Sequence, residues 1–126
     1  MKLSLLKAFL KHDISANQIS EEIKNVIGDY KKLLSKKGST IPIKVTEDIE
    51  FSINKQDVIV LCQAFLDQLL EEYEVNYLVD VLQLSENVNF ESEELFDYVS
   101  ILTDPKVNGE LKNNIDEVMQ YCSSYK

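Results

Sequence analysis

Apolar residues recur at every third or fourth position over most of the chain, a spacing typical of amphipathic α-helices. Residues 2–11 form the first such stretch, with leucines on one side and lysines on the other. Ser15 and Gln18 then form a capping-box pattern that predicts the start of a second helix, and Gly38 predicts its end. The apolar stripe of this second helix comprises Ile19, Ile23, Val26, Ile27, Tyr30 and Leu33.

Between residues 41 and 53, apolar and polar residues alternate, which indicates an extended backbone. One interpretation is a short β-hairpin that turns at Thr46–Asp48. The other is a single extended connector that crosses the helices. The turn has no Asn-Gly signal, and an isolated two-stranded hairpin is only marginally stable, so the pattern leaves both interpretations open.

Helical spacing resumes after Asn54, which forms a second capping pattern with Asp57. The helix that follows is apolar around most of its circumference, a property typical of the central helix of a bundle. In the next helical stretch, residues 71–84, the spacing predicts one side that faces the core and one that faces solvent. The predicted core side is Val75, Leu78, Val79 and Leu82, and the predicted solvent side is Glu72, Asn76, Asp80 and Gln83.

A further helix begins after Asn89 or Ser92, and a last helix occupies the C-terminal residues. Only three glycines and two prolines argue against a turn-rich β-sandwich or barrel. The sequence therefore predicts an all-α, single-domain bundle of about six helices over residues 1–126, with a short β-hairpin or extended segment at 41–53.

The formal net charge of −9 is distributed unevenly along the chain. Residues 1–46 carry nine lysines and four acidic residues, a balance of +5, whereas residues 47–126 carry four lysines and eighteen acidic residues, a balance of −14. Lysine-rich N-terminal helices (1–38) are thus followed by acidic C-terminal helices (54–126). Because the chain is acidic and has no arginine, we do not expect it to bind nucleic acid directly.

Residues 67–97 contain ten carboxylates and no lysine. Carboxylates on the outer side of helices are ordinary solubility features, but a surface that serves only solubility usually mixes both signs of charge. Tyrosines, which are favoured at binding hot spots, lie among these acids. Two of them, Tyr73 and Tyr77, could equally be half-buried core residues. We predict a binding surface for a basic partner that comprises Asp67, Glu71, Glu74, Glu86, Glu91, Glu93, Glu94, Asp97, Tyr73, Tyr77 and Tyr98.

Residues that could support catalysis are scarce. The single histidine, His12, lies beside Asp13 at a predicted helix end, and no nucleophile elbow, P-loop or dinucleotide-binding loop is present. Zinc would have too few histidine and cysteine ligands, and no segment has the spacing of a calcium-binding loop. Cys62 and Cys122 lie on apolar stripes, which predicts buried free thiols. We therefore expect a protein that is not an enzyme and that holds no cofactor or metal.

The N-terminal segment lacks the uninterrupted apolar run and the cleavage site of a signal peptide, and no segment reaches the ~20 apolar residues of a membrane span. We expect a cytoplasmic protein without a membrane partner. A monomer is expected, in which the lysine-rich and acidic parts attract each other, although these parts could also associate head to tail between molecules.

Two parts of the chain resemble known immunity proteins. Residues 2–23, KLSLLKAFLKHDISANQISEEI, resemble the opening of colicin-D-type immunity proteins: a short helix that ends in Phe-Leu, a polar break with Ile-Ser, and a second amphipathic helix. Residues 53–67, 78–95 and 102–111 are similar to small helical immunity partners of bacterial toxin systems, including contact-dependent growth inhibition.

This resemblance implies a cytoplasmic protein that binds a cognate toxin domain and blocks its active site. If the toxin is a nuclease, its cleft must be basic to hold phosphates, and an acidic inhibitor would complement it. The resemblance assigns no contact residues. The alternative is a non-catalytic structural or adaptor subunit that packs one bundle face on another helical protein, with the acids serving solubility.

Overall fold

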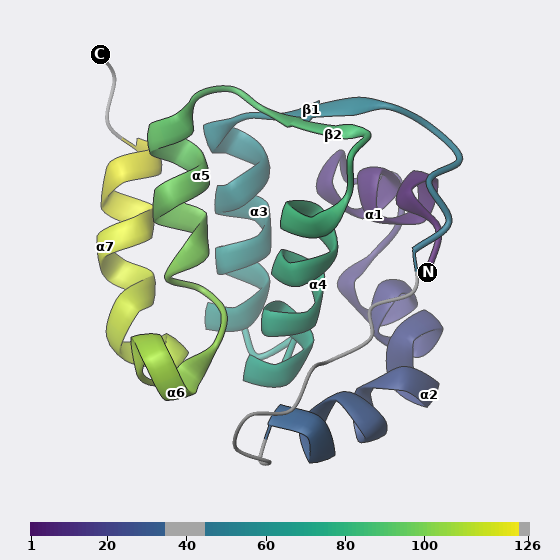
Figure 1. Cartoon of the computed structure of the whole chain (residues 1–126), viewed down its shortest axis with the longest axis horizontal. Coiled ribbons are helices and arrows are strands. Elements are labelled where there is room, and N and C mark those ends of the chain that lie inside the picture. Colours follow the sequence, from purple (N-terminus) through teal and green to yellow (C-terminus); the bar gives the residue numbers. More distant parts are fainter. Residues whose placement is uncertain (35–44, 124–126) are drawn as a thin grey trace.

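Helices make up most of the chain in a computed structural model that describes residues 1–34 and 45–123 (Figure 1). Within these residues, the helices are α1 (Leu3–Leu10), α2 (Ala16–Leu34), α3 (Lys55–Leu66), α4 (Glu72–Leu84), α5 (Glu93–Ser100), the single turn α6 (Pro105–Asn108) and α7 (Leu111–Ser123). The strands are β1 (Phe51–Ile53) and β2 (Val88–Phe90). The six longer helices all contribute buried side chains to one hydrophobic core, which confirms the predicted all-α bundle of about six helices.

α1 spans nearly the predicted stretch, and α2 begins where the sequence predicts. The backbone of His12 has a positive φ of 67°, which prevents α1 from continuing. The capping box of α2 is formed: Gln18 accepts from the Ser15 backbone N–H at 2.8 Å, and the Ser15 hydroxyl accepts from the Gln18 N–H at 3.2 Å. Val26, assigned to the buried stripe, is instead 43 % exposed, because α2 packs only against α1 and α4 and buries a narrow face. The predicted helix end at Gly38 lies outside the described residues.

α3 begins with the predicted capping box and packs along α7 (Figure 1). Asn54 accepts from the Asp57 N–H at 2.9 Å, and Asp57 accepts from the Asn54 N–H at 3.0 Å. The buried Asp57 carboxylate also accepts from Lys11 Nζ at 2.7 Å. A lysine at the end of α1 therefore neutralises an acid of the C-terminal part of the chain.

α3 and α4 both lie in the middle of the bundle, and α4 is the more deeply buried of the two. α3 packs against α1, α4 and α7, and α4 packs against α2, α3 and α5. Eight of the thirteen residues of α4 are buried, compared with five of twelve in α3. The core side of α4 was predicted correctly, but its solvent side was not: Asn76 is buried, and Glu72, Asp80 and Gln83 are half-buried. The helical period alone does not predict the burial of these polar residues, because neighbouring helices cover α4 from several directions.

Polar side chains of α4 make hydrogen bonds to the elements that cover them. Asp80 accepts from the Tyr30 hydroxyl at 2.5 Å and from the Thr103 hydroxyl at 2.8 Å. Asn76 donates to the Leu102 carbonyl at 2.7 Å, while its own side-chain oxygen has no partner among the described residues. Burial raises the pKa of Asp80 above its usual value, although its two hydrogen bonds act in the opposite direction. Burial, followed by the interaction with Asp80, raises the pKa of Tyr30.

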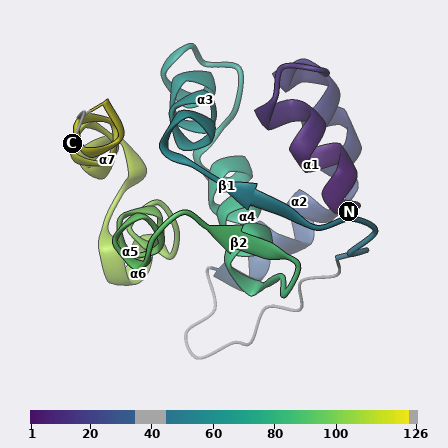
Figure 2. The ribbon, with the colours of Figure 1, turned by 90° about the horizontal axis from the view of Figure 1, so that it is seen from above.

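The two short strands lie across one end of the molecule, above the start of α3 and the end of α4 (Figures 1 and 2). They are parallel, with Phe51 opposite Val88 and Ile53 opposite Phe90, and α3 and α4 form the long crossover that a parallel pair requires. Thr46 forms an isolated bridge with Lys2. Residues 45–53 are thus extended and pair with Lys2 and with β2, as the connector interpretation expects. The first arm of the alternative hairpin, residues 41–44, lies outside the described residues.

The C-terminal helices are joined by a sharp connection. Asp104 (φ 50°) and Gly109 (φ 87°) adopt left-handed backbone conformations on either side of α6. The side chain of Glu72, at the start of α4, accepts from the Leu111 backbone N–H at 2.7 Å and so satisfies a donor at the first turn of α7. Figures 1 and 2 place α5 and α7 on one side of α3 and α4, and α1 and α2 on the other.

Candidate functional site

The acidic run of residues 67–97 does not form one surface, because α4 divides it. One exposed part lies at the connection between α3 and α4, and the other lies beyond the opposite end of α4 (Figure 1). A helix of thirteen residues is about 20 Å long at ~1.5 Å per residue, so the two parts are well separated. Between them, the acids of α4 itself are half-buried or buried.

The larger exposed part, which we call the 86–97 surface, consists of five exposed carboxylates and an exposed aromatic ring: Glu86, Glu91, Glu93, Glu94, Asp97 and Phe96. Among the ion pairs of the described residues, none includes any of these carboxylates. Glu93 and Glu94 lie in the first turn of α5, where the helix dipole favours negative charge. Glu86, Glu91 and Asp97 lie outside that first turn, so the dipole does not account for them.

The backbone beneath this surface is held by regular hydrogen bonds. The Glu91 N–H donates to the Ile53 carbonyl at 2.9 Å at the end of the β1–β2 pair. The Ser92 hydroxyl accepts from the Leu95 N–H at 3.1 Å and caps α5, as one of the two predicted caps. The carboxylates therefore project from a fixed frame rather than from a long loop.

Additional acids from another part of the chain approach the 86–97 surface, and the sequence did not predict them as part of the site. The strand register places Glu50 opposite Asn87, and the Asn87 N–H donates to Glu47 at 2.8 Å. Asp48 is already engaged, because the Ser4 hydroxyl and N–H donate to its carboxylate and lower its pKa. The sequence signal that residues 47–50 approach residues 86–97 is weak. Apolar and polar residues alternate only over residues 88–90 there, a stretch too short to predict a strand.

Apolar side chains accompany the acids at this end of the molecule. Phe96 is 37 % exposed and meets the Phe90 ring edge-to-face, with ring centroids 5.0 Å apart. Gln83 donates to the Phe96 carbonyl at 3.0 Å, which brings the last turn of α4 against α5. Leu84, the last residue of α4, is 66 % exposed. An exposed aromatic and an exposed leucine near unpaired charges resemble the composition of a protein interface.

Two residues assigned to the binding surface are buried, which corrects that assignment. Glu74 accepts from the Glu71 N–H at 2.9 Å and from the Ser20 hydroxyl, so it completes the capping box of α4 and contacts α2. Tyr77 packs edge-to-face against Tyr30, with ring centroids 5.4 Å apart, and burial raises its pKa. In this structure neither side chain offers a surface to a partner.

The remaining predicted residues near the α3–α4 connection are exposed or half-buried but have partners within the chain. Glu71 forms an ion pair with Lys31 at 3.3 Å, and the same lysine lies over the Tyr73 ring, 5.1 Å from its centroid. Asp67 accepts from the Gln63 side chain at 2.9 Å. This part of the acidic run is thus partly neutralised by the lysine-rich N-terminal region.

Tyr98 is half-buried and belongs to the contact between α5 and α7. Its ring stacks on Tyr121, with centroids 4.0 Å apart and planes inclined by 9°. Lys55 lies over the other ring of this pair, 4.6 Å from the Tyr121 centroid. The stack accounts for Tyr98 without a partner protein.

Groups that could carry chemistry are buried or isolated in the described part of the chain. Cys62 and Cys122 are free and buried, as predicted, and burial raises their pKa to about 12 and about 11, which keeps both thiols protonated near neutral pH. His12 is exposed at the end of α1. Residues 1–34 and 45–123 contain no cluster of three or more potential metal ligands, and none of their helices has the length and apolar character needed to cross a membrane.

The chain matches no protein-family model, and no curated protein or solved structure shows significant similarity to it.

Proposed function

We propose that this chain is a non-catalytic immunity protein, which binds a basic toxin domain in the cytoplasm through the 86–97 surface. The observation that carries this proposal is the set of exposed carboxylates at Glu86, Glu91 and Asp97, which have no lysine partner among the described residues and lie outside the first turn of α5. Unpaired like charges repel one another, and a cationic surface would relieve that repulsion. The resemblance of residues 2–23 to colicin-D-type immunity proteins supports the same function.

The position of the apolar residues supports a protein partner rather than a small cation. Phe96 and Leu84 offer apolar contact area beside the carboxylates. Affinity at protein interfaces comes mostly from a few buried anchors, whereas rim charges mainly raise the association rate. In this proposal, Phe96 provides an anchor and the carboxylates steer the toxin domain into place.

A nuclease is the toxin class that fits best, because a cleft that binds phosphates must be lined with cations. The acidic surface would occupy that cleft as a polyanion does. No covalent step and no cofactor are involved.

A growth-rescue experiment tests this function. Cells that express the proposed basic toxin domain should grow when the wild-type chain is co-expressed. The variant Glu86→Lys/Glu91→Lys/Asp97→Lys should fail to protect. The matched control Asp29→Lys/Asp116→Lys/Glu117→Lys makes the same change in net charge on exposed positions of α2 and α7 and should protect. Failure of the wild-type chain to restore growth would overturn the proposal.

An adaptor role remains the second candidate, because exposed leucines also occur at the other end of α4. Leu66 and Leu69, at the α3–α4 connection, are 44 % and 47 % exposed. A helical protein that packs on these leucines would bind with little dependence on salt, since no charge pairing is required. A dissociation constant that is the same at low and high salt would favour the adaptor role over the inhibitor.

A further inference from the structure

The register of the two parallel strands determines which backbone groups of β2 are already used. The Phe51 N–H donates to the Asn87 carbonyl at 3.1 Å, just before β2, and the Glu91 N–H donates to the Ile53 carbonyl at 2.9 Å, just after it. Successive residues of a strand direct their N–H and C=O groups to alternate edges. The odd-numbered residues of this segment, including Asn89, therefore pair with β1, and the even-numbered residues face the opposite edge.

Val88 and Phe90 thus direct their backbone N–H and C=O groups to the outer edge of β2. Among the described residues, no other backbone or side-chain group forms a hydrogen bond with these groups. Seen from above, β1 lies between β2 and the helices α1 and α3, so β2 is the outer strand of the pair (Figure 2). A strand edge of this kind can accept a further strand from another molecule.

Carboxylates lie at both ends of this edge. Glu86 precedes β2 by two residues and Glu91 follows it directly; both are exposed, and neither forms an ion pair among the described residues. Glu50, which precedes β1, is exposed as well. Lys55 lines a hollow together with Glu91, but its ammonium lies over the Tyr121 ring and does not form an ion pair with that carboxylate. The charge beside the edge is therefore predominantly negative.

This charge decides between two kinds of added strand. A second copy of this chain does not fit, because two β2 edges side by side would bring Glu86 and Glu91 of both copies together, and like charges on neighbouring strands destabilise their pairing. A strand that carries lysine or arginine does fit, because opposite charges on neighbouring strands stabilise the pair.

The two faces of β2 indicate a further property of the added strand. Val88 and Phe90 turn their side chains toward the core, where the partly exposed Phe96 ring meets the Phe90 ring. Asn89 and Glu91 are exposed on the opposite face. Because side chains alternate along a strand, a segment beside β2 would turn every second residue toward the side of Phe96 and the others toward the side of Glu91. A segment in which apolar and basic residues alternate fits both faces.

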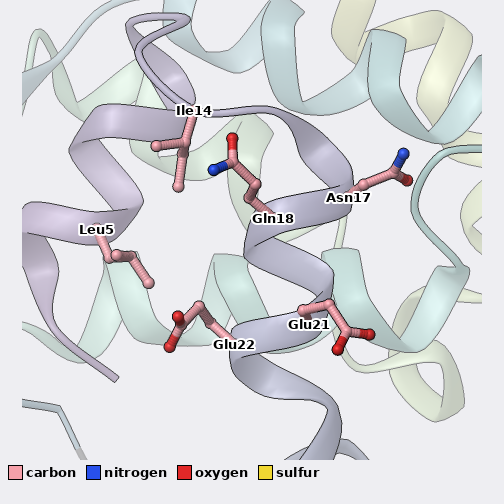
Figure 3. A pocket seen from close by; sticks show the side chains of 6 residues that line it. All are labelled: Leu5, Ile14, Asn17, Gln18, Glu21 and Glu22. Carbon is pink, nitrogen blue, oxygen red and sulfur yellow. The ribbon is translucent and has the colours of Figure 1, made fainter.

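The hollow of about 360 Å³ between α1 and α2 lacks such a one-sided charge. In Figure 3, the side chains of Leu5, Ile14 and Glu22 border the same space. The adjoining hollow, which shares Leu5 and Glu22, is also lined by Lys2. A carboxylate and an ammonium in one place favour neither a cation nor an anion, so this region serves as a control.

We propose that β2 accepts an extended segment of the basic partner as an added strand, in which basic residues alternate with apolar ones. The backbone groups of Val88 and Phe90 pair with the main chain of this segment, its basic side chains lie beside Glu86 and Glu91, and its apolar side chains contact Phe96. The inference rests on the proposed function for the nature of the partner. It adds which kind of segment binds, and how.

Hydrogen exchange of the free, full-length chain is the first test. The amide hydrogens of Val88 and Phe90 should exchange faster than that of Asn89, which the pairing with β1 protects. Slow exchange of both edge amides in the free chain would mean that the edge is already covered, and would overturn the proposal.

A synthetic peptide is the second test, with NMR chemical shifts and hydrogen exchange as readouts. The acetylated and amidated peptide Lys-Val-Lys-Val-Lys-Val-Lys supplies charge, apolar side chains and main-chain groups. A control peptide with every amide N-methylated keeps the side chains and the charge but cannot pair as a strand. At low salt, the first peptide should bind at least about fivefold more tightly, the gain from two net hydrogen bonds, and should slow exchange at Val88 and Phe90. Equal binding of the two peptides would overturn the proposal.

Two variants of the chain test the contribution of charge. Glu86→Gln/Glu91→Gln should weaken binding of the unmethylated peptide roughly two- to tenfold at low salt, the range that two exposed ion pairs provide. The matched variant Glu21→Gln/Glu22→Gln, on exposed positions of α2, removes the same charge and should bind the peptide as wild type does. Equal losses in the two variants would show attraction by net charge alone and would contradict a site at β2.

These tests use no toxin, so their outcome can be separated from that of the proposed function. If the peptide fails to bind but the wild-type chain protects cells, the added strand is wrong and the immunity function stands. If the peptide binds as expected but the chain does not protect cells, the strand site stands and the immunity function is wrong.

Discussion

The carboxylates of α4 and those of the 86–97 surface belong to the same acidic stretch but serve the molecule differently. Glu72, Glu74 and Asp80 accept hydrogen bonds from α7, α2 and the residues that follow α5. Glu86 and Asp97, by contrast, are exposed and take part in none of the described ion pairs. The first group holds neighbouring elements together, and the second group remains available to a partner.

This difference shows that charge density along a sequence does not identify a binding surface. A buried carboxylate is stable only when donors satisfy it, and such donors come from elements distant in sequence. Ser20, Tyr30, Thr103 and the Leu111 N–H provide them here. A carboxylate without such donors is left to solvent or to another molecule.

The largest expected effect comes from removing an interior carboxylate. Asp80→Ala should lower the free energy of unfolding by about 1–3 kcal/mol, because the buried Tyr30 hydroxyl loses its acceptor, whereas the Thr103 hydroxyl keeps a second acceptor, the Asn76 carbonyl at 3.2 Å. Asp97→Ala, on the surface, should change it by less than about 0.5 kcal/mol. Urea titrations of the two variants measure both values. Adding Tyr30→Phe to Asp80→Ala should recover part of the loss, whereas equal losses for the two alanine variants would contradict the distinction.

A smaller effect is expected at the start of α7. Glu72→Ala should cost about 0.5–2 kcal/mol, the usual range for the loss of a helix-capping acceptor, because the Leu111 N–H loses its partner. Glu86→Ala is the matched control, since its exposed carboxylate takes part in none of the described ion pairs and should change stability by less than about 0.5 kcal/mol. Thermal unfolding monitored by circular dichroism compares the two variants. A more destabilised Glu86→Ala variant would count against the assigned role of Glu72.

The pH dependence of stability should distinguish Asp80 from ordinary surface acids. Burial raises its pKa in the folded state, so the folded chain binds more protons than the unfolded chain between the unfolded pKa and this raised value. The contribution of Asp80 to stability is therefore greatest at low pH and declines as the pH rises through that window. Relative to Asp80→Asn, the wild-type chain should lose stability as the pH rises above about 4, the usual pKa of an aspartate in an unfolded chain. If the stability of the wild-type chain relative to Asp80→Asn instead increased with pH, the pKa of Asp80 in the folded state would be lowered rather than raised.

The smallest expected effect concerns the surface acids themselves. Glu86→Gln/Glu91→Gln/Asp97→Asn should leave stability unchanged within about 0.5 kcal/mol. At low salt it should raise stability slightly, because each close pair of like charges costs about 0.2–0.5 kcal/mol. Chemical unfolding at two salt concentrations measures this. A loss above about 1 kcal/mol would mean that these carboxylates hold the fold together after all.

The parts of the fold that could be predicted from the sequence are those that local patterns control. The capping boxes at Ser15 and Asn54 depend on neighbours within a few residues, and the structure has them where predicted. The pairing of residues 51–53 with 88–90 depends on contacts distant in sequence. No local pattern encodes it.

The candidate site was predictable only in part, for the same reason. The exposed carboxylates from Glu86 to Asp97 follow from polar positions flanking a short amphipathic helix. The burial of Glu74 could not be predicted, because it requires α2 and α4 to pack together. For Tyr77 the sequence left a core position open as an alternative, and its packing against Tyr30 of α2 decides for that alternative. The position of α4 at the centre of the bundle decides which of its polar residues reach solvent, and a helical period alone does not contain that information.

The association rate between the purified chain and the basic toxin domain that we propose as its partner tests the central claim most directly, when measured by stopped flow at low and high salt. For the variant Glu86→Lys/Glu91→Lys/Asp97→Lys, we predict a rate at least about tenfold below wild type at low salt, a gap that narrows at high salt as the charges are screened. For the matched variant Asp29→Lys/Asp116→Lys/Glu117→Lys, the association rate at low salt should fall much less. Equal association rates for the two variants would contradict a role for the 86–97 surface in binding a basic partner.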